Sequence, residues 1–201
     1  LLAISIISLL GIDTNSLVAV IAAAGFAVGL ALKEYLANFA GGVILLTLRP
    51  FKVGDVIEAN GYSGTVEAIQ ILYTRVATFD NKVVLIPNGV LSNSSITNFT
   101  LKDTRRVDLS FTAAYEADTD KVIKVLKDMV NNHPRVLAEP EPFVRMSEHA
   151  DSAVIYSVKA WVKTDDYWSV YFDLIEAAKR RFDEENISIP YPQRDVYVYQ
   201  K

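Results

Sequence analysis

The chain has 201 residues, 51% of them hydrophobic, and a net charge of −4. It contains no cysteine, which excludes disulfides, thiol catalysis and thiolate metal sites. Its two histidines, His133 and His149, lack the spacing of a metal-binding pair. The negative charge gives no general attraction to nucleic acid. We therefore expect no metal, no cofactor and no nucleic-acid partner.

The excess of apolar side chains lies in the first fifty residues. Residues 1–12 are almost wholly apolar, a polar turn follows, and residues 17–32 carry no charge. Because the chain opens inside an apolar stretch and without Met, we interpret residues 1–12 as the end of an upstream transmembrane helix. The uncharged run is close to the lower limit of about 17 residues for crossing a bilayer. It is therefore either a membrane-spanning helix or a buried hairpin of a globular protein.

The positive charges favour the membrane interpretation. No Lys or Arg precedes Lys33, whereas Lys33, Arg49 and Lys52 follow the apolar run closely. Positive residues collect on the cytoplasmic side of membrane helices. We therefore expect a transmembrane helix over residues 16–48, with its C-terminal end in the cytoplasm.

Small residues give this helix two distinct flanks when it is drawn at about 100° per residue. One flank is a ridge of Ala23, Ala27 and Ala31. The nearly opposite flank is a groove made by Gly25 and Gly29 and bordered by Ala22. Helices in lipid associate through close backbone approach at small residues, so each flank predicts a neighbour. A ridge that fits the next helix's groove is a head-to-tail contact, which closes into a ring.

The two remaining faces of the helix differ in what they carry. One face holds Ala19, Phe26, Leu30 and Lys33. The other holds Ile21, Ala24, Val28 and Leu32. We expect the first face to line the lumen of the ring and the other face to meet lipid or further helices. In the alternative, Phe26 and Leu30 are ordinary packing in a two-helix contact, which would need only one small flank.

Beyond the charged pair Lys33 and Glu34, helical patterning resumes as far as residue 48. This segment contains Gly41 and Gly42 and has an amphipathic pattern. It predicts a kinked helix whose second half lies along the membrane surface. The Arg49–Pro50 pair ends the helix.

From residue 53 the apolar period changes to two. Short strands are expected at 53–58, 65–73, 75–78 and 82–86, with turn signals at Asn60–Gly61 and Asp80–Asn81. Together with a bend at Gly64, they predict a small β barrel of the SH3 or Sm type over residues 53–100.

Residues 101–190 combine strands and helices. We expect strands at 106–112, 143–147 and 153–163, and helices at 119–131 and 167–185. This order is the split strand-helix-strand pattern of ferredoxin-like α+β domains. The last residues, 191–201, are expected to form a C-terminal strand contributed to a shared barrel.

Neither of these later domains offers catalytic chemistry. Asp118 and Asp120 open a helix, so we interpret them as helix caps and not as an acid-base pair.

Two other functional classes compete with a pore. A membrane-tethered Sm-like or α+β module that binds RNA would need a basic face, and the strand region offers only Arg75 and Lys82 among acidic residues. A membrane-anchored enzyme of acylphosphatase-like fold would need a nucleophile, a base or a phosphate loop. We therefore predict that the chain is not an enzyme.

Four motifs in this order carry a family resemblance. They are "AAAGFAVGLALKEYLANFAGGV" in the apolar helix, "RPFKVGD" after it, "IPNG" at residues 86–89 and "ISIPYPQRDV" at residues 187–196. The sequence resembles the small-conductance mechanosensitive channel family, MscS, over practically its whole length.

The resemblance implies a homoheptamer in the bacterial inner membrane, with three transmembrane helices per subunit, the third lining the pore, above a cytoplasmic vestibule. Membrane tension would open it during osmotic downshock to release ions and small solutes. Residue by residue, the family's gate falls on Phe26 and Leu30, its packing glycines on Gly25 and Gly29, and its second flexible point on Gly42.

The sequence departs from the family pattern at three positions. Glu34 stands where the family usually has a kink glycine, Lys33 stands where it has glutamine, and Phe26 replaces one gate leucine. The resemblance therefore implies a hinge at Glu34, Gly41 and Gly42 whose flexibility differs from that of other members.

Overall fold

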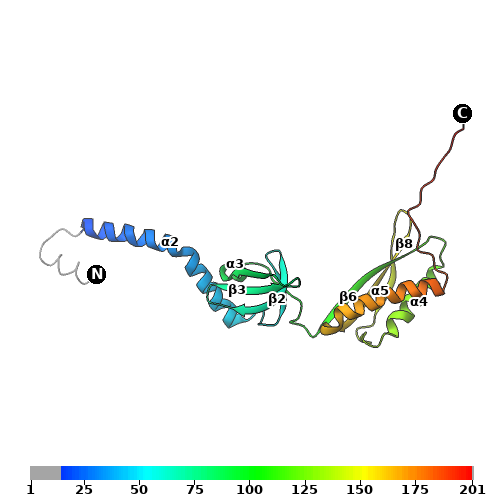
Figure 1. Cartoon of the computed structure of the whole chain (residues 1–201), viewed down its shortest axis with the longest axis horizontal. Coiled ribbons are helices and arrows are strands. Elements are labelled where there is room, and N and C mark those ends of the chain that lie inside the picture. Colours follow the sequence, from blue (N-terminus) through cyan, green and yellow to red (C-terminus); the bar gives the residue numbers. More distant parts are fainter. Residues whose placement is uncertain (1–14, 201) are drawn as a thin grey trace. The chain divides into compact units, whose positions relative to one another are not determined.

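The computed structural model describes residues 15–200 (Figure 1). These residues divide into two compact units, the first ending at Leu101 and the second beginning at Lys102. The first unit contains a long helix and a β domain, and the second is an α+β domain.

The long helix α2 (Asn15–Leu48) is continuous through the Ala-rich segment, Glu34 and both candidate hinge glycines. Its ribbon bends along its length between the dark-blue and the cyan part (Figure 1). The helix ends where Arg49 takes a left-handed conformation with φ of 48° and donates its N–H to the Leu45 carbonyl at 3.0 Å. This is a common way to satisfy the last carbonyls of a helix. Pro50 then prevents the helix from continuing.

The β domain is one antiparallel sheet with strand order β4-β3-β2-β1-β5. Its elements are β1 (Val56–Ala59), β2 (Tyr62–Ile69), β3 (Tyr73–Thr78), β4 (Val83–Pro87), α3 (Asn88–Asn93) and β5 (Thr97–Asn98). The Asn60–Gly61 turn is confirmed: both residues have positive φ, and Ala59 pairs directly with Tyr62 across it. Two consecutive residues with positive φ are what the two-residue hairpin turn of type I′ requires.

Apart from shifted strand ends, such as β1 at Val56–Ala59 where 53–58 was expected, the β domain differs from the sequence prediction in two places. The strand expected at 65–73 is interrupted, because the Gln70 N–H donates to the Tyr73 carbonyl at 2.9 Å and closes a turn between β2 and β3. Apolar alternation runs on through this turn as Ile69, Ile71 and Tyr73, so the period alone did not reveal it. The short helix α3 and the two-residue strand β5 were not predicted, since neither is long enough to show a period.

The α+β unit has a three-stranded antiparallel sheet of order β6-β8-β7. Its elements are β6 (Thr104–Ala113), α4 (Thr119–Asn131), β7 (Phe143–His149), β8 (Val154–Lys163), a 3-10 turn (Thr164–Asp166) and α5 (Tyr167–Glu184). Strands β6 and β7 both pair antiparallel with β8, so they run parallel to each other with β8 between them. The predicted split strand-helix-strand arrangement is therefore confirmed.

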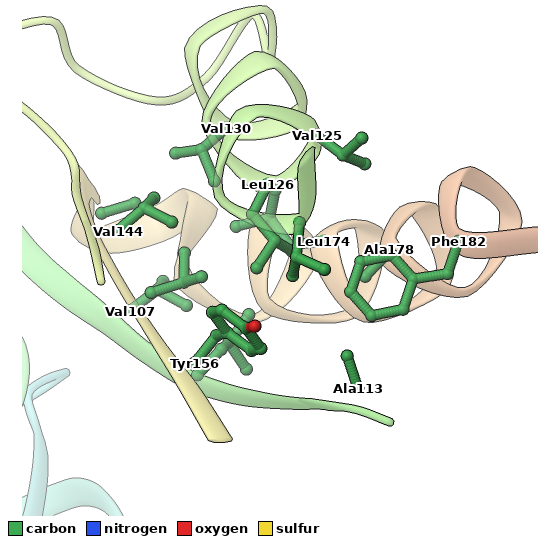
Figure 2. Packing of buried hydrophobic residues seen from close by; sticks show 14 of the residues in the cluster. Val107, Ala113, Val125, Leu126, Val130, Val144, Tyr156, Leu174, Ala178 and Phe182 are labelled. Atoms are coloured by element: carbon green, nitrogen blue, oxygen red, sulfur yellow. The ribbon is translucent and has the colours of Figure 1, made fainter. Parts of the chain in front are cut away.

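Both helices of this unit pack on the sheet. Figure 2 shows Leu126 of α4 and Leu174 of α5 pointing toward Tyr156 of β8. All three side chains have no exposed surface. Every second residue of β8 from Val154 to Val162 is buried, as expected for a strand with one face on the core.

The capping role is confirmed for Asp118 but not for Asp120, which lies in the first turn of α4. The Asp118 carboxylate accepts hydrogen bonds from the backbone N–H groups of Asp120 and Lys121, at 2.9 and 3.2 Å. Loss of such a cap costs a helix about 1 kcal/mol. We expect Asp118→Ala to speed hydrogen-deuterium exchange of α4 amides about fivefold. Asp120→Ala, which removes no cap, is the control and is expected to have a smaller effect; equal effects would contradict the capping role.

Residues 191–200 belong to no strand of the described chain, and all of them are exposed. A strand needs a neighbour for its backbone hydrogen bonds, and the expected neighbours belong to other subunits. The C-terminal strand therefore stays a prediction about the assembled protein.

Candidate pore helix and its attachment to the β domain

Almost the whole surface of α2 is exposed in the single chain. Only Gly41, Gly42 and Leu45 are buried among its 34 residues. The helix is long and apolar enough to cross a membrane, and none of its most apolar stretch is buried. Phe26 is 75% exposed and Leu30 is 63% exposed. An apolar surface of this size requires lipid or other subunits to cover it.

Every site residue predicted from the sequence lies on this one helix. The lumen face, the alanine ridge and the glycine groove all belong to its first 20 residues, from Asn15 to Glu34. Apart from the adjacent backbone of α2 itself, no atom of the described chain lies within 4 Å of the position that a Cβ would take at Gly25 or Gly29. Within residues 15–200, no other segment therefore covers the glycine groove or the exposed alanine ridge. Their packing role and the gate role of Phe26 and Leu30 stay predictions about contacts between subunits.

The second half of α2 packs closely on the β domain. A Cβ on Gly41 would lie 2.6 Å from the backbone C and O of Asn88, and one on Gly42 would lie 2.5 Å from the carbonyl oxygen of Ile71. Real Cβ atoms do not approach backbone so closely, so a side chain at either position would push the helix away. The structure thus gives a steric reason for glycine here, in addition to the predicted hinge role.

Asn88 is the centre of this contact and is fully buried. Its side-chain amide donates to the carbonyls of Gln70 and Ile71 at 2.8 and 3.1 Å. Its Oδ1 accepts from the hydroxyl of Thr74 at 2.9 Å, and Thr74 is also fully buried. A polar side chain can be buried without a large free-energy cost when its polar atoms are hydrogen-bonded in this way. Asn88 therefore fixes the turn before β3 and the start of α3 as one rigid surface for the helix.

Asn38 joins the helix to the same surface directly. Its Oδ1 accepts the backbone N–H of Gly89 at 2.9 Å, across 51 residues of sequence. That N–H is at the start of α3, where helices lack internal acceptors for their donors. The helix α2 and the β domain are thus connected by a hydrogen bond as well as by close packing.

Sequence reasoning missed the role of Asn38 and Asn88. Asn38 lies within the predicted helical pattern and was not singled out, and Asn88 entered only as part of the "IPNG" motif. An amide on an otherwise apolar helical segment is a usable signal, because it requires a partner when it is covered. The partner itself is not visible in the sequence.

We expect Gly41→Ala to separate α2 from the β domain and to destabilise the first unit by about 1–3 kcal/mol, the usual range for overpacking. The measurement is the thermal unfolding midpoint of the purified protein in detergent. Ala40→Ser at the neighbouring exposed position is the matched control. A midpoint unchanged by Gly41→Ala would show that the contact is not tight.

Residues 15–200 offer no group of three or more His, Asp or Glu side chains that could hold a metal ion. The exposed apolar surface of α2 is one that lipid or other subunits would cover.

Comparisons with known proteins identify the family to which the chain is similar. Residues 34–101 match the family described as "Mechanosensitive ion channel, beta-domain", and residues 107–189 match "Mechanosensitive ion channel MscS, C-terminal". The small-conductance mechanosensitive channel of Edwardsiella ictaluri is 46% identical over 178 residues, which cover 89% of this chain and 62% of that protein. An uncharacterized MscS family protein of Synechocystis is 46% identical over 191 residues, covering 95% of this chain and 64% of that protein.

A solved structure agrees as well. The crystal structure of Helicobacter pylori MscS in the closed state has a TM-score of 0.91 and 33% identity, and the match covers 98% of this chain and 79% of that one. A helix that could cross a membrane, followed by a β domain and an α+β domain, is thus the fold of a mechanosensitive channel subunit. The chain belongs to the MscS family of mechanosensitive ion channels. This family is not a class of enzymes. The chain spans between three fifths and two thirds of the length of the first two relatives.

Proposed function

We propose that this chain is the pore-lining and cytoplasmic part of a channel that opens under membrane tension and releases ions and small solutes on osmotic downshock. Its partners are further copies of itself, in a ring of seven, the lipid bilayer and the permeating solutes. The protein is a multi-pass protein of the bacterial inner membrane, with the β domain and the α+β domain in the cytoplasm.

One observation carries the proposal. The helix α2 has two small flanks and an apolar face with Phe26 and Leu30, and the rest of the described chain covers none of them. A two-helix contact would cover one small flank and leave the other exposed, whereas a closed ring covers both. Rings of large apolar side chains around a narrow lumen resist wetting and block ions.

The attachment of α2 to the β domain supports a role in gating. The contacts of Asn38, Gly41 and Gly42 with the β domain hold the second half of the helix. The first half has no such contact in the described chain. Tension that moves the first half outward would therefore act against an anchored second half, and the segment between them would take up the movement.

The experiment uses the complete protein in liposomes. We expect a single closed oligomer in detergent with a mass near seven subunits, and single-channel currents that appear as suction on a patch is increased. A monodisperse monomer or dimer would remove the pore and favour a membrane-tethered binding module. A ring without suction-dependent current would leave a pore but remove the tension gating.

A further inference from the structure

Lys33 and Glu34 are the only charged residues of α2. Both are exposed, and no ion pair found within residues 15–200 includes either of them. They stand at the C-terminal end of the uncharged run. Charges at such a position are costly without partners and are usually paired.

The helix itself gives neither residue a partner. Adjacent residues on a helix point about 100° apart, so Lys33 and Glu34 of one chain do not face each other. The neighbours three and four positions from Lys33 are Gly29, Leu30, Leu36 and Ala37. Those of Glu34 are Leu30, Ala31, Ala37 and Asn38. None of these side chains is charged, and Asn38 already accepts the N–H of Gly89.

Lys33 lies on the part of the lumen face that borders the glycine groove, and Glu34 lies beyond the opposite border of that face. At about 100° per residue, Lys33 falls beside Gly29 and Ala22, at the edge of the glycine groove. Glu34 falls between the directions of Ala23 and Ala27, on the alanine ridge. In a ring where each ridge enters the next groove, Glu34 of one subunit therefore points toward the side of the next subunit that carries Lys33.

Ring symmetry also places Lys33 and Glu34 of neighbouring subunits at nearly the same height along the pore axis. Subunits related by rotation about the pore axis have the same residue at the same level, and consecutive helical residues differ by only about 1.5 Å along the axis. Glu34 and the next subunit's Lys33 are thus almost level. Opposite charges at the same level on facing flanks are complementary, and the contact repeats at every interface.

We propose that Glu34 of each subunit forms an ion pair with Lys33 of the next subunit, so that a closed ring of ion pairs surrounds the inner end of the gate. This inference rests on the proposed ring of pore helices. The ring of pairs joins neighbouring subunits where the apolar gate ends, and it makes the charge at this level of the pore neutral. Widening the pore must stretch or exchange these pairs.

Charge reversal tests the pairing. We compare Lys33→Glu, Glu34→Lys and the double variant carrying both, in the complete protein, by the temperature at which the purified oligomer dissociates and by the suction that opens half of the channels. Each single reversal places like charges at every interface, so we expect a lower dissociation temperature and a shifted opening suction. The double variant restores opposite charges and is expected to recover at least half of both shifts. Lys124→Glu, an exposed lysine of α4, controls for the change in net charge.

Neutral variants keep the test valid if a reversal prevents assembly. Lys33→Gln or Glu34→Gln alone leaves one charge without its partner, whereas the double glutamine variant leaves none. We expect each single glutamine variant to dissociate at a lower temperature than the double. If the wild type forms a ring and the effects of the two single substitutions simply add in either double variant, the ion pair is contradicted. The proposed channel is not affected by that result. A wild-type protein that forms no ring would overturn both.

Discussion

Leu30→Ser is expected to open the channel at lower suction than the wild type or to leak at rest, and to slow the growth of cells that express it. Phe26→Ser is expected to act in the same direction. Each substitution removes a large apolar side chain, worth about 1.5–3 kcal/mol in transfer from water, from every subunit around the lumen. The serine hydroxyl also offers hydrogen bonds to water, so a constriction of the same radius wets more easily.

The measurement is a patch recording from liposomes with stepped suction, together with a growth curve after induction. Val28→Ser is the matched control, because Val28 is a similarly exposed apolar residue on the opposite face of the helix, 58% exposed against 63% for Leu30. If Phe26 and Leu30 were ordinary packing between two helices, serine would weaken assembly. Fewer openings at an unchanged threshold would therefore contradict the gate.

The sequence predicted most accurately the elements whose limits depend on their own residues and close neighbours in the chain. The helix α4 begins and ends at the predicted residues, Thr119 and Asn131. Its limits follow from the Asp118 cap and from Val122, Leu126 and other apolar residues at helical spacing. The Asn60–Gly61 turn is similarly local, because few residues other than Asn and Gly tolerate positive φ.

The missed elements depend on contacts far along the chain. The short helix α3 forms where Asn88 bonds to Gln70, Ile71 and Thr74, and where Asn38 meets Gly89. None of these pairs is close in sequence, and six residues give no period. The motif "IPNG" could be recognised, but its function as a surface for α2 requires the fold.

The candidate site shows a different limit. A helical wheel can place Gly29 and Ala27 on different flanks, and the structure shows that α2 is a helix over this whole segment. The partners expected for those flanks are other subunits, so the structure of one chain does not show these contacts. By contrast, the family resemblance implied only a hinge role for Gly41 and Gly42, while the structure shows backbone of the same chain against both.

The second prediction with a large expected effect concerns Gly29, whose small size is not required within the described chain. Gly29→Val is expected to prevent or weaken assembly of the ring while leaving the fold of the single chain intact. A valine at Gly29 has free space among the described residues, since no atom beyond the adjacent backbone of α2 lies within 4 Å of its Cβ position. In the ring the same side chain would enter the groove that receives the next subunit's alanine ridge. Overpacking costs about 1–3 kcal/mol at one contact, and here it is repeated at every interface.

The matched control is Val28→Ile, which adds one methylene to the neighbouring residue on the face away from the lumen. We expect Val28→Ile to keep the oligomer mass and the opening suction of the wild type. Gly29→Val is expected to shift the mass toward smaller species, or to change the opening suction where a ring still forms. Circular dichroism then separates assembly from folding, because the helical signal of Gly29→Val should match that of Val28→Ile. Equal oligomer mass and equal suction for the two variants would mean that Gly29 does not face a neighbouring helix, and the two flanks would have to be reassigned.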